Sequence, residues 1–223
     1  MSRELPDSVI DCLKNQMFIE MEHFLEKYFS FDEQFRIDAA QRFSAMLNTA
    51  NDIRRGKATE HDLIDHYFEE GSHDENEFLQ AMYDCFRELS AQTGEELKRS
   101  IYAHVNRGGE DWFPLVIIDK KMNDYNDLPK EVTVYRGCSV EEFYSKNFRQ
   151  SWSVDKQIAT IFAFTHFSNL DKHERVVVKA LVDRNDIAWN RKLEGEVVLL
   201  PGFKPLCTTI AMTYDDYYKK LAN

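Results

Sequence analysis

Three short motifs in the second half of the chain carry side chains that could bind an anion and stabilise a charged reaction centre. They are Tyr-Arg-Gly at residues 135–137, Ser-Trp-Ser at residues 151–153 and Glu-Gly-Glu at residues 194–196. An arginine guanidinium is a permanently charged planar fork that fits phosphate oxygens. A carboxylate can act as a general base or stabilise developing positive charge. Together, the three motifs predict a site for an anionic substrate.

Arg136 lies near the end of an alternating apolar and polar stretch, residues 132–140, which is typical of a β-strand. Gly137 has no side chain, so we interpret it as leaving room for a ligand beside the arginine. The alternative is that Arg136 forms an ion pair with a neighbouring acid.

Ser151 and Ser153 precede a predicted helix, residues 153–164, in which Ala159 and Ala163 lie on the buried side. Phe162 is expected on the same buried side. Ser153 is well placed to be the N-cap of this helix, and Ser151 is then available for a hydrogen bond within the site. Trp152 should point to the opposite face, where it either packs against another element or forms a wall of the site.

Glu194 and Glu196 are two residues apart. In an extended backbone their side chains therefore lie on one face, about 7 Å apart. One carboxylate could bind a sugar hydroxyl while the other addresses an acceptor. The alternative is an exposed strand edge that carries two acids.

In this order, the three motifs resemble those of the arginine-serine-glutamate branch of the ADP-ribosyltransferase superfamily, which includes cholera-toxin-like bacterial toxins and phage enzymes. The resemblance covers residues 130–205 and does not extend to the first 110 residues. It implies a mono-ADP-ribosyltransferase that transfers ADP-ribose from its substrate NAD to a macromolecule, preferentially a protein arginine, without a metal. Some relatives instead modify RNA or DNA bases, or hydrolyse NAD.

The resemblance also implies a role for each residue. Glu196 would be the principal catalytic residue, Ser151 would brace it within the site, and Glu194 would orient or deprotonate the acceptor. The residues that would bind NAD are Arg136, Tyr135, Gly137, Ser151, Ser153 and Phe164. Phe164 begins a segment expected to cover the phosphates and the nicotinamide, with His166, Phe167 and Lys172 as further candidates. Each of these four side chains could instead serve packing or lie on the surface, and the Ser-Trp-Ser motif departs from the common Ser-Thr-Ser form.

The elements that must position these motifs predict an α+β fold. In the first half, apolar residues recur every three to four positions within residues 9–28, 35–47 and 78–89, which indicates amphipathic helices. From about residue 130, short β-branched runs punctuated by Gly, Pro and Asn indicate strands. We therefore expect a helical region at residues 1–125 and an ADP-ribosyltransferase-like split β-sheet core at residues 126–223, joined in one compact unit.

The composition is that of a folded protein, with 43% hydrophobic, 13% aromatic and 30% charged residues. The chain contains neither a long apolar run nor a basic, apolar start, so we expect no membrane association and a cytoplasmic location, which could include delivery into a host cytoplasm.

The scattered cysteines suggest reduced thiols, and Cys138 has no adjacent base that would make it a nucleophile. His61 and His66 are five residues apart, which does not suit two metal ligands on one helical face. GxGxxG and P-loop motifs are both absent, which disfavours those nucleotide folds.

Negative charge is concentrated in the first half of the chain. Residues 1–110 hold 12 Lys or Arg against 23 Asp or Glu, whereas residues 111–223 hold 16 of each kind. An acidic helical region repels nucleic acid and favours a basic partner, such as an antitoxin or a host protein. A plain solvated surface, or a non-catalytic module that binds a basic partner, would have the same charge pattern.

Overall fold

The computed structural model describes residues 5–67, 71–105, 114–122, 125–166, 170–191 and 195–221. It forms two compact units, Met1–Ile117 and Ile118–Asn223, where we expected one, and the division precedes the predicted boundary at residue 125. The backbone of Ile118 forms hydrogen bonds of 3.0 and 2.7 Å with the side-chain amide of Gln150. The Met122 amide donates to the carbonyl of Ala188. These bonds tie the segment after Ile117 to the second unit.

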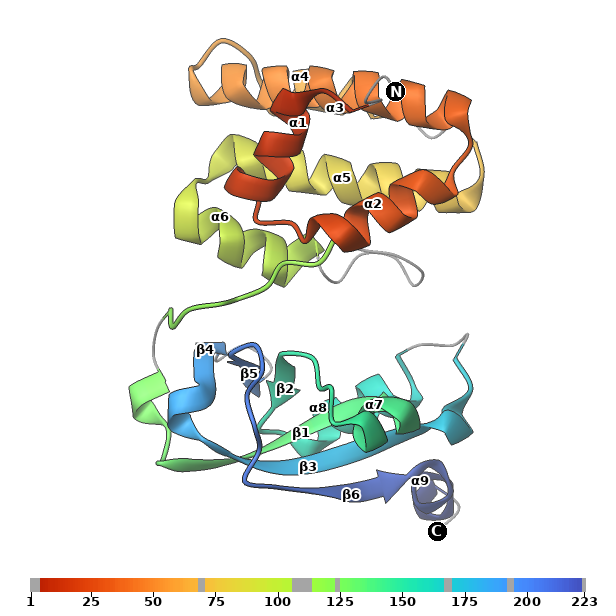
Figure 1. The fold of residues 1–223 in the computed structure, drawn as a ribbon, viewed down its shortest axis with the longest axis vertical. Coiled ribbons are helices and arrows are strands. Elements are labelled where there is room, and N and C mark those ends of the chain that lie inside the picture. Colours follow the sequence, from red (N-terminus) through yellow and green to blue (C-terminus); the bar gives the residue numbers. More distant parts are fainter. Residues whose placement is uncertain are drawn as a thin grey trace. The chain divides into compact units, whose positions relative to one another are not determined.

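The first unit is helical (Figure 1). It contains α1 (Asp7–Asp11), α2 (Met21–Ser30), α3 (Glu33–Arg54), α4 (Glu60–Ile64), α5 (His73–Ala91) and α6 (Gly94–Ser100), and the π-helical turns η1 (Cys12–Gln16) and η2 (Ile101–Val105). Helix starts carry side chains that accept backbone N–H groups, such as Asp32 before α3 and Ser72 before α5.

Aromatic side chains form the centre of this helical unit. Phe24, Phe43, Phe78 and Phe86 are fully buried, and their rings pack at centroid distances of 5.7 Å (Phe24–Phe78), 5.9 Å (Phe43–Phe78) and 6.1 Å (Phe43–Phe86). Burial of such large apolar surfaces drives helix packing. The predicted amphipathic faces of α3 and α5 are confirmed. Residues 9–28, predicted as one amphipathic face, bury their apolar side chains but are divided among α1, η1 and α2, with Phe18 at a positive φ before α2.

The second unit contains a six-stranded sheet in which all paired neighbours are antiparallel. The strand order is β4-β5-β2-β1-β3-β6. The strands are β1 (Glu131–Ser139), β2 (Ser151–Ser153), β3 (Arg175–Asp183), β4 (Ile187–Arg191), β5 (Glu196–Leu199) and β6 (Cys207–Thr213), and the helices are α7 (Val140–Ser145), α8 (Lys156–Phe164) and α9 (Tyr214–Leu221). The predicted order, helices first and a β-rich half second, is confirmed.

The sheet nearly separates between β1 and β2. Strand β1 pairs with β3 along its whole length, from Glu131 to Ser139. Its pairing with β2 is limited to Tyr135 opposite Ser153. Two three-stranded parts, β4-β5-β2 and β1-β3-β6, are therefore joined at one position, and backbone groups on either side of it need other partners.

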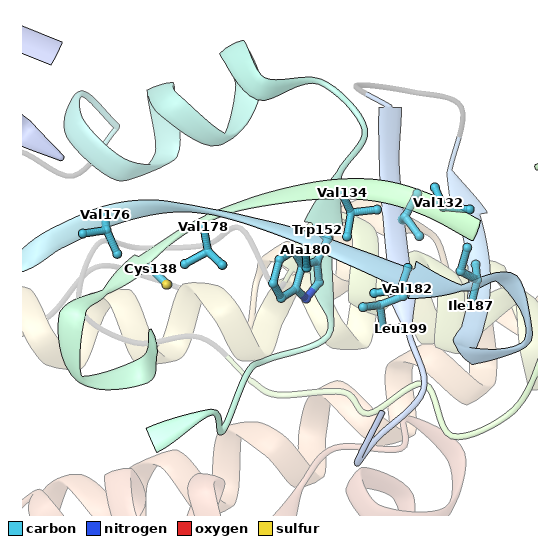
Figure 2. Packing of buried hydrophobic residues seen from close by; sticks show 11 residues of the cluster. Val132, Val134, Cys138, Trp152, Val176, Val178, Ala180, Val182, Ile187 and Leu199 are labelled. Atoms are coloured by element: carbon cyan, nitrogen blue, oxygen red, sulfur yellow. The ribbon is translucent and has the colours of Figure 1, made fainter. Parts of the chain in front are cut away.

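The two faces of the sheet bury different side chains because residues alternate along each strand. One face carries Val134, Cys138 and Trp152, which belong to the cluster in Figure 2, with side chains of α7 packed against it. The other face carries Tyr135 and packs against α8. By this alternation Arg136 leaves β1 on the face of Val134 and Cys138.

No helix in the described part of the chain is both long enough and apolar enough to cross a membrane.

Candidate active site

Ser151 and Glu196 meet across the β2–β5 pair. In this register Ser151 lies opposite Val198 and Ser153 lies opposite Glu196, so both serines and Glu196 share one face of the sheet. The Ser151 hydroxyl donates a 2.7 Å hydrogen bond to Glu196 Oε1. The contact expected between these two motifs is therefore present, although the residues are 45 positions apart.

Arg136 forms the ion pair that we considered as the alternative. Its Nε lies 2.7 Å from Glu142 Oε1, and a terminal nitrogen lies 3.3 Å from Glu142 Oε2. Its other terminal nitrogen donates a 2.7 Å hydrogen bond to the carbonyl oxygen of Ser151. The Arg136 side chain is only 14% exposed, so these bonds compensate a charge that is largely removed from water.

The bond from Arg136 to Ser151 fills a gap in the sheet. The carbonyl of Gln150 accepts the Leu199 amide of β5. Because successive carbonyls of a strand point to opposite sides, the Ser151 carbonyl points toward β1, which no longer pairs with β2 at this level. The guanidinium takes the place of the missing backbone donor. Arg136 and Glu196 are thus linked through Ser151, whose carbonyl binds one and whose hydroxyl binds the other.

Glu142 was not predicted from the sequence. It lies in the first turn of α7, where its amide donates a 3.0 Å hydrogen bond to Ser139 Oγ, the N-cap. Ser139 and Glu142 have the spacing of a capping box, in which the acid would turn back to the N-cap backbone. Here its carboxylate binds Arg136 and the Arg149 amide instead.

Arg191 was not predicted either. It lies directly opposite Glu196 in the β4–β5 pair and donates to Glu196 Oε2. The Arg191 side chain is 7% exposed and that of Glu196 is 12% exposed, so the ion pair is buried. The centre of the Arg191 guanidinium lies 5.3 Å from the Trp189 ring. Predicting residues 187–199 as a hairpin would have indicated this pair.

Ser153 is not the N-cap of α8. It is the last residue of β2, and its hydroxyl accepts the Asp155 amide at 2.9 Å. The N-cap is Asp155, whose carboxylate accepts the Gln157 amide at 2.7 Å. The predicted N-cap lies two residues before the observed one because β2 continues through Ser153.

Gly137 does not leave space for a ligand. A Cβ atom at this position would lie 2.5 Å from both the Ala159 carbonyl oxygen and the Ala163 nitrogen. The glycine therefore allows the backbone of α8 to approach β1 closely. Ala159 and Ala163 are buried, as predicted, whereas Phe162, expected on the same side, is only half-buried.

Phe164 lies in the core, so its ring is not available for contact with NAD. It is 1% exposed, and its ring stacks on Tyr217 of α9 at a centroid distance of 5.2 Å. Tyr135 is half-buried and packs against the same cluster. Nothing in these contacts brings Phe164 to the network of Arg136, Ser151 and Glu196.

The other candidate residues that the structure describes are buried or form contacts within the fold. Trp152 is 2% exposed, and its indole donates a 3.0 Å hydrogen bond to the Arg149 carbonyl, so it packs in the core. Burial raises the pKa of the Cys138 thiol to about 12, which disfavours the nucleophilic thiolate, as we expected. The His66 ring lies 2.9 Å from the Thr49 hydroxyl. Glu194 and Phe167 lie outside the described residues.

The site is thus a chain of polar contacts that runs from Glu142 through Arg136, Ser151 and Glu196 to Arg191. A carboxylate has about four acceptor positions, so a serine and an arginine can orient it while a sugar hydroxyl is also bound. Among the residues that the structure describes, no group of three or more His, Cys, Asp or Glu is placed to hold a metal ion. No protein-family model, no curated protein and no solved structure matches this chain.

Proposed function

We propose that this protein is a mono-ADP-ribosyltransferase of the arginine-serine-glutamate type, with an ADP-ribosyltransferase-like sheet as its core and NAD as its substrate. The observation that carries the proposal is the hydrogen bond from Ser151 to Glu196, with Arg136 bound to the carbonyl of the same serine. Three strands contribute these residues, and the three motifs follow the order that the resemblance requires.

In the proposed reaction, the bond between the nicotinamide nitrogen and ribose C1′ breaks, and its electron pair leaves with neutral nicotinamide. The ribose becomes a cation, which the acceptor then attacks at C1′ while losing a proton. The Glu196 carboxylate stabilises this cation and accepts a hydrogen bond from the 2′-hydroxyl. Ser151 fixes one oxygen of that carboxylate.

Arg136 has two roles in this proposal. It holds β2 through the Ser151 carbonyl, and it binds the NAD phosphates with the donors that remain. Its bonds to Glu142 and Ser151 engage three of its five N–H donors in the described part of the chain. A bidentate fork is suited to phosphate oxygens.

We propose a protein arginine as the acceptor, with Glu194 as the residue that orients or deprotonates it. RNA or DNA bases are the alternative acceptors, and water would make the enzyme an NAD hydrolase. The excess of acidic residues in residues 1–110 would suit a basic antitoxin or host protein, bound in the cytoplasm where NAD is available.

The decisive experiment measures nicotinamide release and transfer of labelled ADP-ribose by the purified protein. Glu196→Gln removes the negative charge while keeping the shape, and we expect a loss of at least about 100-fold. Glu131→Gln is the matched control, because it makes the same chemical change at an exposed position at the start of β1, and it should keep the wild-type rate. Equal rates for wild type and Glu196→Gln, with both folded by circular dichroism, would contradict the proposal.

The labelled product identifies the acceptor. Protease sensitivity and an ADP-ribosylated arginine in mass spectrometry would support a protein acceptor, and nuclease sensitivity would indicate RNA or DNA. Free ADP-ribose alone would indicate hydrolysis. A protein that neither binds nor cleaves millimolar NAD would be a non-catalytic binding module.

A further inference from the structure

Arg191 holds the proposed catalytic carboxylate from the side opposite to Ser151. Strands β4 and β5 pair in a register that places Arg191 directly across from Glu196. Directly opposed residues of an antiparallel pair have Cβ atoms about 5 Å apart and share a face. The guanidinium therefore reaches Glu196 Oε2, whereas Ser151 binds Oε1. Each oxygen of the carboxylate is bound by a residue from a different strand.

Burial restricts the positions that the Glu196 carboxylate can take beside Arg191. The side chains of Arg191 and Glu196 are 7% and 12% exposed, and a charge that is removed from water in this way needs a partner. Removing one partner from a buried ion pair leaves the other uncompensated, so it takes up a new position. The position of the Glu196 carboxylate therefore depends on Arg191.

The Arg191 guanidinium also contacts an aromatic ring. Its centre lies 5.3 Å from the ring of Trp189, two residues earlier on β4. A planar guanidinium stacks on an aromatic ring and donates through a rigid fork, whereas a lysine ammonium is a compact charge on a flexible stem. An arginine is thus better suited than a lysine to fix the plane of the carboxylate.

We propose that Arg191 is a positioning residue that fixes the Glu196 carboxylate for cleavage of the bond between nicotinamide and ribose. This inference rests on the proposed function. It assigns no contact between Arg191 and NAD, so loss of Arg191 affects the chemical step more than substrate binding.

The test compares steady-state NAD cleavage by three single variants. For Arg191→Met we expect kcat to fall about 100-fold, because displacement of a reacting group by about 1 Å has an effect of this size. KM for NAD should change by less than about threefold. Arg191→Lys should recover about tenfold of the loss, since it restores the charge without the fork. The control Arg184→Met removes a guanidinium of the same unit that binds the Asn126 and Leu128 carbonyls, and it should stay within about threefold of wild type.

A double variant separates positioning from a general loss of structure. If Arg191 acts through Glu196, adding Arg191→Met to Glu196→Gln should lower kcat by less than about threefold more. A full further loss of about 100-fold would overturn the inference, and so would equal kcat values for Arg191→Met and Arg184→Met. Absence of NAD cleavage by the wild type would overturn the proposed function and this inference with it.

Discussion

Glu196 and Arg136 are largely buried charges, and each has an oppositely charged partner. Arg136 pairs with Glu142, and Glu196 pairs with Arg191, while Ser151 lies between the two pairs. Because the two ion pairs are each neutral, the network carries no excess positive charge. We infer that it would recognise an anionic substrate through directed hydrogen bonds rather than through a general attraction.

At the same scale, Gly137 gives a prediction on stability. Gly137→Ala should lower the free energy of unfolding by about 3 kcal/mol, because the new methyl group meets backbone atoms of α8 that cannot rotate away. Urea unfolding measures this change. Thr133→Ala, at a half-buried position on the same strand, is the control and should cost less than about 1 kcal/mol. A fully stable Gly137→Ala protein would show that α8 does not pack as closely as described.

At the scale of elements, helix α7 is held by polar contacts as well as by packing of Val140 and Phe143 against the sheet. None of its residues, Val140–Ser145, is fully buried. Its first turn is tied to β1 and to the segment before β2 because Glu142 binds both the Arg136 guanidinium and the Arg149 amide. The ion pair therefore fixes α7 beside the split between β1 and β2.

Glu142→Gln should thus destabilise the second unit more than loss of a surface ion pair would. We expect the free energy of unfolding to fall by about 3 kcal/mol, because a mostly buried guanidinium loses its counter-charge. In the double variant Glu142→Gln with Arg136→Met, much of this loss should be recovered, since no uncompensated charge remains. Urea unfolding followed by tryptophan fluorescence measures both. Simple additivity of the two single changes would contradict the coupling.

At the scale of the whole molecule, both compact units enclose thiols. Cys12 and Cys85 are buried in the first unit, and Cys138 is buried in the second. Burial raises the pKa of Cys12 and of Cys138 from 9.0 to about 12, and it raises that of Cys85 well above 9.0. The cause in each case is removal of the thiolate from water.

These shifts predict a loss of stability at alkaline pH. Between about pH 9 and pH 12, the folded thiol of Cys138 keeps its proton while the unfolded thiol loses it, so unfolding releases a proton. The contribution to stability is fully present below pH 9 and falls by about 1.4 kcal/mol per pH unit above it. Urea unfolding of Cys138→Ala across this range should give a shallower slope than wild type. Cys207→Ala removes an exposed thiol and should keep the wild-type slope.

Local patterns of the sequence determined the order of elements and the candidate motifs. Apolar spacing indicated the faces of α3 and α5, and β-branched runs indicated the strands, because these periodicities depend on residues within one element. The sequence also placed Ala159 and Ala163 on the buried side of α8 and suggested the contact between Ser151 and Glu196. The extended backbone expected through Glu194 and Glu196 is wrong, because Gly195 between them has a φ of 60°, in the left-handed region, and β5 begins only at Glu196.

The partners of the polar side chains follow from how the strands assemble into the sheet. Arg191 binds Glu196 because β4 and β5 pair in one register, and Arg136 binds the Ser151 carbonyl because β1 and β2 separate there. Register and separation of strands result from packing of the whole sheet, which no single segment encodes. For the same reason, two residues that we expected at a ligand serve packing instead. Gly137 lies against the backbone of α8, and Phe164 packs against Tyr217 of α9.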